Sequence, residues 1–239
     1  MKIIAIIPAR YASTRFPGKA LAAIKGKPMI QHVYQQAILA QLDRVIIATD
    51  DQRIYRYARE FGGEAVMTSV QHRSGTDRIA EVVRNLSCDL VVNIQGDEPL
   101  IIPEIIEAAI QPFWQEQDLV MGTLKKRITE QREVNDHNVV KVVTDQDDFA
   151  LYFSRSPIPF RRKQATDYYK HIGLYVYQRD FLLKYAELPP TPLEKSESLE
   201  QLRALENGYR IRVVETEYNP IGVDTPADIA RVERILESR

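Results

Sequence analysis

Short apolar runs alternate with longer amphipathic segments over the first half of the chain. The apolar runs have the length and composition of buried strands, and they are 2–7, 44–49, 65–69 and 89–94. The amphipathic segments repeat apolar residues at helical spacing, and they are 28–42, 51–61, 76–86 and 103–114. Strands alternating with helices in this way predict a parallel sheet covered by helices.

After about residue 118 the pattern becomes richer in strands. The strand-like stretches that follow have no clear crossover helix between each pair, and they are 119–128, 138–145, 149–156 and 171–177. Antiparallel strands are therefore expected, either at the sheet edge or in an outlying ribbon. The remaining expected elements are helices at 179–187 and 193–207, a strand at 209–216 and a last helix opened by Thr225-Pro226 after Asp224. The predicted fold class is α/β, with a mixed, mostly parallel sheet flanked by helices.

Composition narrows the class of protein. The chain has 239 residues, 44% hydrophobic and 27% charged, which is typical of a soluble globular protein with one large core or two modest ones. The 32 basic and 33 acidic residues leave a net charge of −1, so no global positive field favours nucleic acid as a partner. No Gly-, Ser- or Pro-rich linker divides the chain, and a single domain over 1–239 is expected.

The single cysteine and the first residues bear on the cellular compartment. Cys88 alone excludes a disulfide framework and a cysteine zinc site, which fits a reducing cytoplasm. The chain begins with a strand and its loop rather than the pattern of a signal peptide, and no apolar segment reaches membrane-spanning length. We therefore expect a cytoplasmic protein that does not bind membranes.

The loop after the first strand, PARYASTRFPGK at 8–19, carries Arg10, Arg15 and Lys19. In open α/β sheets ligands gather at the carboxyl ends of the strands, where backbone N–H groups and cations hold phosphates. A solvated basic surface loop is the alternative for any one of these residues. Three cations in one loop of a nearly neutral chain favour a polyphosphate clamp. The loop lacks GxxxxGKS and GxGxxG, so a P-loop or a dinucleotide site is disfavoured.

Acidic residues follow two other predicted strands. IQGDEP places Asp97 and Glu98 after the strand at 89–94, and GVDTP places Asp224 before the last helix. Carboxylates beside bound phosphates are what Mg²⁺ coordination requires. The alternative for Asp224 is a helix N-cap. Paired acids at the end of a buried strand have little structural reason unless a cation or several donors compensate them.

A third polar segment, HRSGTDR at 72–78, leads into the predicted helix at 76–86. Ser74, Gly75, Thr76 and Asp77 form a turn and a helix start, for which simple capping is the ordinary explanation. The same small polar residues can present groups to a base or a ribose, and the two roles are compatible.

These motifs together resemble the 3-deoxy-manno-octulosonate (KDO) cytidylyltransferase family over nearly the whole chain. The matching segments, in order, are IPARYASTRFPGK, ATDD, HRSGTDR, NIQGDEP, FSRSPIPF, KHIGLYVY, LEQLRALENG and GVDTPADI. The resemblance implies a nucleotide-diphospho-sugar transferase-like fold with a small β-rich dimerisation part at roughly 125–190, and hence a homodimer. It also implies the reaction of CTP with KDO to give CMP-KDO and diphosphate, for lipopolysaccharide biosynthesis.

The resemblance also implies roles for particular residues. The implied catalytic residues are Arg10, Lys19, Asp97 and Asp224, of which Asp97 and Asp224 would hold Mg²⁺. The implied nucleotide-binding residues are Ala9, Arg10, Arg15, Lys19, Ser74, Gly75, Asp77, Arg78 and Gln95. The implied sugar-binding residues are Gln95, Arg155, His171, Tyr175, Glu200 and Gln201. The anomeric 2-hydroxyl of KDO would attack the α-phosphorus of CTP, and no separate protein base is assigned.

Several residues have simpler explanations, and other functions remain open. His171 and Tyr175 share one face of a strand and fit a packed core, while Glu200 and Gln201 fit the polar side of a helix whose Leu199, Leu202 and Leu205 face the core. Activation of another 2-keto acid sugar, such as sialic acid, is the alternative within the enzyme class. A non-catalytic nucleotide-binding module is the alternative outside it. A phosphohydrolase with a covalent intermediate is disfavoured, because Pro-Ala-Arg follows the first strand where an aspartate is needed.

Overall fold

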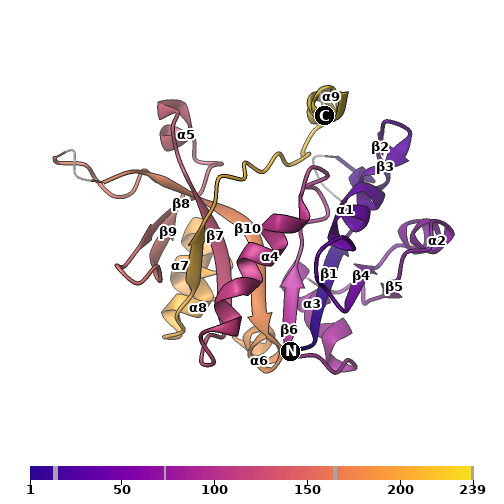
Figure 1. Cartoon of the computed structure of the whole chain (residues 1–239), viewed down its shortest axis with the longest axis horizontal. Coiled ribbons are helices and arrows are strands. Elements are labelled where there is room, and N and C mark those ends of the chain that lie inside the picture. Colours follow the sequence, from indigo (N-terminus) through magenta and orange to yellow (C-terminus); the bar gives the residue numbers. More distant parts are fainter. Residues whose placement is uncertain (13–15, 73, 164–165, 238–239) are drawn as a thin grey trace. The chain divides into compact units, whose positions relative to one another are not determined.

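A computed structural model of the chain describes residues 1–12, 16–72, 74–163 and 166–237 (Figure 1). The chain folds into two compact units. Unit 1 comprises Met1–Glu107 and Pro220–Arg239, and unit 2 comprises Ala108–Asn219. The helix α4 (Pro103–Ile110), continued by the 3₁₀ turn η2 (Gln111–Trp114), contains the boundary between them in the sequence.

Unit 1 contains four parallel strands in the order β6–β1–β4–β5. Their bounds are β1 Ile3–Ala9, β4 Arg44–Thr49, β5 Ala65–Met67 and β6 Leu90–Asn93. The connecting helices are α1 Met29–Ala37, α2 Gln52–Glu60 and α3 Gly75–Arg84. All four residues of β6 and most of β1 are buried, as expected for strands covered on both faces. The predicted parallel sheet with crossover helices is confirmed.

The last part of the chain returns to unit 1. Helix α9 (Pro226–Glu237) packs against β2 (Ala23–Ile24), which forms a small hairpin with β3 (Lys27–Pro28) after the 3₁₀ turn η1 (Lys19–Leu21). Figure 1 shows α9 beside this hairpin. The buried residues that join these segments are Ile24, Met29, Leu100, Val223 and Val232. Burial of Val223 in this cluster fixes the position of its neighbour Asp224.

Unit 2 has a mixed sheet. Strand β7 (Met121–Arg127) pairs antiparallel with β10 (Tyr169–Gln178) and parallel with β11 (Arg212–Glu215). Strands β8 (Lys141–Thr144) and β9 (Ala150–Ser154) form an antiparallel pair, and β8 also meets β10. The helices α5 (Gln131–Asn135) and α6 (Arg179–Glu187) lie between strands in the sequence. The predicted antiparallel strands are confirmed, and so is the mixed α/β class.

The predicted helix over 193–207 is wrong in one respect. The structure has two short helices, α7 (Pro192–Glu197) and α8 (Leu202–Glu206), separated by a turn. Ser198 takes a left-handed conformation with φ 53°, which ends α7. Leu199 and Leu202 are buried, while Leu205, expected in the core, is only half-buried. The turn therefore places Glu200 and Gln201 between helices rather than on a helix face.

None of the helices in the described ranges is long and apolar enough to cross a membrane.

Candidate active site

A cavity of about 440 Å³ lies within unit 1 where β1 and β6 end. Its walls come from the loop after β1, the loop after β6, the start of α3 and the segment before α9. The lining residues are Pro8, Ala9, Arg10, Ala12, Lys19, Ala20, Met29, Gly75, Arg78, Gln95, Gly96, Asp97 and Asp224. Eight of the residues implied for nucleotide, metal or catalysis thus line one cavity: Ala9, Arg10, Lys19, Gly75, Arg78, Gln95, Asp97 and Asp224. Arg15 lies outside the described residues.

The loops after β1 and β6 approach each other closely. A Cβ atom at Gly96 would lie 3.0 Å from the carbonyl oxygen of Pro8. Glycine therefore permits the backbone of the acidic loop to approach that of the basic loop. This contact brings Asp97 to the side of the cavity that Lys19 also lines.

Lys19 joins the two acids that were expected to bind metal. Its ammonium Nζ lies 2.5 Å from Asp97 Oδ2 and 3.4 Å from Asp224 Oδ1. The backbone N–H of Val223 donates to the carbonyl of Asp97 at 2.9 Å, which ties the last segment to the loop after β6. Both carboxylates are partly exposed, with 30% of the Asp97 side chain and 48% of the Asp224 side chain accessible. The two carboxylates therefore hold the ammonium of Lys19 and remain accessible from the cavity.

The neighbouring acid, Glu98, is in a different environment. Burial and the adjacent Asp97 raise the pKa of Glu98 to about 8, so its carboxyl is protonated at neutral pH. From the sequence, we expected a cation or several hydrogen-bond donors to compensate the negative charges of both Asp97 and Glu98. The structure instead buries one acid in its neutral form and leaves Asp97 at the cavity.

Arg78, at the first turn of α3, is fully buried. Its Nη2 donates to Asp50 Oδ2 at 2.7 Å and its Nη1 donates to the hydroxyl of Thr68. No described residue accepts a hydrogen bond from its buried Nε. The motif ATDD contains Asp50, but the sequence alone assigns no role to Asp50 or to Thr68. A charge partner 28 residues away could not be assigned without the fold.

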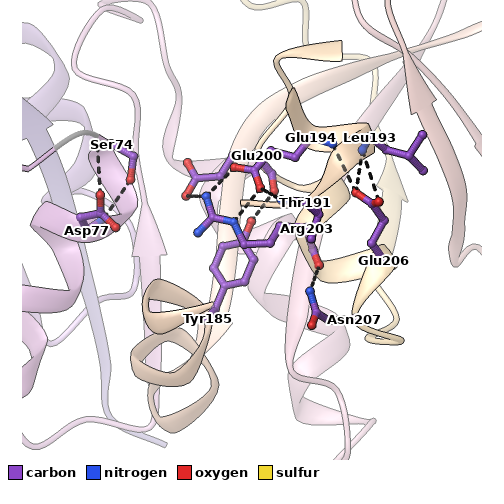
Figure 2. A network of polar contacts seen from close by, with 10 residues as sticks. All are labelled: Ser74, Asp77, Tyr185, Thr191, Leu193, Glu194, Glu200, Arg203, Glu206 and Asn207. Atoms are coloured by element: carbon purple, nitrogen blue, oxygen red, sulfur yellow. Dashed lines mark hydrogen bonds and ion pairs between the residues drawn. The ribbon is translucent and has the colours of Figure 1, made fainter. Parts of the chain in front are cut away.

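Ser74 and Asp77 form a capping box at the start of α3. The backbone N–H of Asp77 donates to Ser74 Oγ at 3.1 Å, and the backbone N–H of Ser74 donates to Asp77 Oδ2 at 3.2 Å (Figure 2). The capping explanation is thereby confirmed for both residues. Neither lines the cavity, although Gly75 between them does.

In unit 2, His171 on β10 lies near one aromatic ring of β9 and one of β10. Its ring centroid is 5.1 Å from Phe153 and 5.3 Å from Tyr175. The hydroxyl of Thr123 is 3.0 Å from His171 Nε2 and 2.9–3.0 Å from two backbone carbonyls, of Leu174 and Ile172. Carbonyl oxygens can only accept, so the single hydroxyl proton of Thr123 is directed to them. The hydroxyl oxygen therefore accepts a hydrogen bond from His171 Nε2–H, and Nδ1 of the neutral ring is an acceptor. Burial lowers the pKa of His171 to about 3, and the ring is neutral.

The depressed pKa of His171 predicts a loss of stability in acid. Between pH 6.5 and 3 the unfolded chain takes up a proton that the folded imidazole excludes, so stability is lost as pH falls through this window. Relative to His171→Gln, the wild-type free energy of unfolding should fall by up to about 1.4 kcal/mol per pH unit. Denaturant unfolding at several pH values between 4 and 7 measures the difference. Parallel curves for the two proteins would contradict the buried neutral ring.

Arg155, implied as a sugar-binding residue, makes three hydrogen bonds to backbone carbonyls. Nε donates to Glu197 at 2.7 Å, Nη1 to His137 at 3.0 Å and Nη2 to Ser198 at 3.4 Å. Arg155 thus holds the carboxyl end of α7. A guanidinium has more N–H donors than these bonds use, so a further acceptor such as a carboxylate can still be bound.

Glu200 and Gln201 lie in the turn between α7 and α8. Gln201 is 4% exposed, and its amide Nε2 donates to no described residue. A buried donor without a partner carries a free-energy cost, which a ligand acceptor would remove. The turn that creates this environment was absent from the sequence prediction.

Comparison with known proteins decides the family. The model for cytidylyltransferases matches residues 4–211. The chain belongs to the cytidylyltransferase family. This cytidylyltransferase is 61% identical over 240 residues to the 3-deoxy-manno-octulosonate cytidylyltransferase of Solibacter usitatus (strain Ellin6076), covering 99% of the chain and 95% of the relative. It is 58% identical to the enzyme of the same name from Trichlorobacter lovleyi (strain ATCC BAA-1151 / DSM 17278 / SZ), covering 99% of each.

A solved structure resembles the cytidylyltransferase over its full length. It is described as CMP:2-keto-3-deoxy-manno-octonic acid synthetase complexed with CTP, and it superimposes with a TM-score of 0.96 at 44% identity. The match covers 100% of this chain and 99% of the other. The resemblance stated from the motifs and the predicted nucleotidyltransferase fold are both confirmed, and the chain is an enzyme of the nucleotidyltransferase class.

Proposed function

We propose that this enzyme transfers CMP from CTP to KDO, releasing diphosphate, as the activation step for lipopolysaccharide synthesis. The observation that carries the proposal is the cluster of Lys19, Asp97 and Asp224 in a cavity that Arg10 and Arg78 also line. Cations and carboxylates together suit a nucleoside triphosphate and its metal ion. The specificity for KDO is taken from the relatives that carry this name.

Asp97 and Asp224 fit a divalent cation. Cytidylyltransferases generally use a divalent metal ion, and we propose Mg²⁺. In proteins, Mg²⁺ typically binds through one or two carboxylates together with substrate phosphates. Asp97 and Asp224 suit this role because both already contact one positive charge, the ammonium of Lys19. When bound, the ion would neutralise charge on the phosphates and favour ionisation of the attacking hydroxyl.

The residues of the cavity have separate roles in this proposal. Arg10 and Lys19 bind the triphosphate and stabilise the charge that moves to diphosphate as the bond to the α-phosphorus breaks. Arg15 is proposed to join them. Gly75 and Arg78 contact the cytidine, and Ser74 and Asp77 support them through the capping box. Gln95 lines the cavity and is proposed to contact both substrates.

The sugar is proposed to bind through residues of unit 2. Arg155 offers its remaining N–H groups to the carboxylate of KDO. His171 offers Nδ1 as an acceptor for a sugar hydroxyl, since its Nε2 is held by Thr123. Tyr175, Glu200 and Gln201 bind other hydroxyls, and the amide Nε2 of Gln201, which donates to no described residue, gains an acceptor.

We further propose that the enzyme acts in the cytoplasm as a homodimer, with the segment at roughly 125–190 forming the dimerisation part. The support is the family resemblance rather than any contact within one chain.

Diphosphate release tests the proposed activity. The enzyme with CTP and Mg²⁺ should release diphosphate with KDO, and not with glucose 1-phosphate or ribitol 5-phosphate, because only a 2-keto acid sugar presents a carboxylate beside the reacting carbon. Sialic acid serves as the matched 2-keto acid control. Turnover of a sugar phosphate without turnover of KDO would overturn the proposal, and binding of CTP with no turnover of any sugar would indicate a binding module.

A further inference from the structure

Tyr185 on α6 holds the turn that contains Glu200 and Gln201. Its ring is 1% exposed, and its hydroxyl donates to the carbonyl of Glu200 at 2.6 Å (Figure 2). The same carbonyl accepts from the backbone N–H of Arg203 at 3.0 Å, which is a bond of the first turn of α8. Both acceptor positions of the Glu200 carbonyl are thus used, and one of them depends on Tyr185.

The ring of Tyr185 also connects with the aromatic residues of β10. Its centroid is 6.1 Å from Tyr177, with the two rings nearly parallel, and Tyr177 is 5.9 Å from Tyr175. Tyr175 in turn is 5.3 Å from His171. Because buried rings in contact move little relative to one another, Tyr185 fixes the turn relative to the strand that carries His171 and Tyr175.

A buried ion pair also lies near the Tyr185 ring. The guanidinium carbon of Arg203 lies 5.2 Å from the ring centroid, and Arg203 binds Glu194 through Nε at 2.8 Å and Nη2 at 2.5 Å. Figure 2 shows these side chains around Glu200, whose Oε1 is 3.7 Å from Arg203 Nη2. The main ion-pair partner of Arg203 is Glu194, through two hydrogen bonds. Its contact with the carboxylate of Glu200 is longer and contributes less to neutralising that carboxylate.

We propose that Tyr185 is a positioning residue for the sugar site, which sets the turn of Glu200 and Gln201 against His171 and Tyr175. The inference rests on the proposed sugar-binding role of these four residues. Tyr185 is too buried to touch a substrate, and it acts through the carbonyl of Glu200. Nothing in the sequence marks it, because it stands on the apolar face of α6 like any core tyrosine.

Tyr185→Phe removes the single hydroxyl and keeps the ring. The KM for KDO should rise about 5-fold, as expected from the loss of one buried hydrogen bond, while the KM for CTP stays unchanged. The matched control is Tyr209→Phe, which also removes one tyrosine hydroxyl. The ring of Tyr209 lies 4.8 Å from that of Phe181, and Phe181 is on α6 together with Tyr185. This control should leave both KM values unchanged. Thermal unfolding of each variant reports whether the fold persists.

Gln201→Ala separates the inference from the function on which it rests. We expect Gln201→Ala and Tyr185→Phe each to raise the KM for KDO. If the double variant has a KM close to that of Gln201→Ala alone, Tyr185 acts through the turn as proposed. If Gln201→Ala raises this KM and Tyr185→Phe does not, the positioning role is overturned and the sugar site stands. If neither variant affects KDO, both are overturned. Equal rises in KM for KDO and CTP in Tyr185→Phe would also overturn the inference, since they indicate a general structural effect.

Discussion

Asp97→Asn should lower kcat/KM for diphosphate release by about 10³-fold while the protein remains folded. Asp97 is one of the two partly exposed carboxylates that contact Lys19, and it lines the cavity, so its charge is accessible to a ligand and is not enclosed in the core. Loss of the negative charge of Asp97 removes a proposed contact to the metal ion. The metal ion then stabilises the negative charge on the phosphates in the transition state less well. Steady-state kinetics with CTP, KDO and Mg²⁺ measure the effect.

Glu98→Gln is the matched control for this experiment. The carboxyl of Glu98 is buried and holds its proton at neutral pH, so an amide of the same shape changes no charge. We expect activity at pH 7 to remain within about 3-fold of wild type. Near-normal activity in Asp97→Asn, or a comparable loss in Glu98→Gln, would contradict the assignment of Asp97 as the metal ligand of this motif.

Asp50→Ala should lower the free energy of unfolding by about 3–5 kcal/mol. The guanidinium of Arg78 is fully buried and is bound to Asp50 at 2.7 Å, so loss of the carboxylate leaves a buried charge without this ion-pair partner. Chemical denaturation measures the change, with an unchanged dependence on denaturant indicating the same unfolding transition.

Asp51→Ala provides the comparison for Asp50. Asp51 caps α2 and binds Arg53, whose side chain is 58% exposed, so its removal should cost only about 1 kcal/mol. The double variant Asp50→Ala/Arg78→Met removes both charges and should recover part of the stability lost in Asp50→Ala. Equal losses for Asp50→Ala and Asp51→Ala would show that burial of Arg78 does not set the cost.

The pattern of apolar residues determined most of the fold. Strand β4 begins and ends where the sequence predicted, and the helix α6 matches its predicted range. Strand β4 is a continuous buried run and α6 repeats its buried residues at helical spacing, so each element has a local signature in the sequence. The motifs also determined the family, since eight short segments in a fixed order specify more than any one of them does.

Only the tertiary structure decided how distant residues meet. Asp224 reaches Asp97 and Lys19 because Val223 is buried in a cluster with Ile24 and Met29, and no local pattern contains that information. The protonated state of Glu98 and the pairing of Arg78 with Asp50 follow from burial, which depends on every element packed around them. The turn at Glu200 was missed for the same reason, because the apolar spacing of Leu199 and Leu202 fits a helix equally well. The sequence by itself determined which elements form and which chemistry they carry, whereas packing between segments far apart in the chain decided the charge, contacts and orientation of the individual groups.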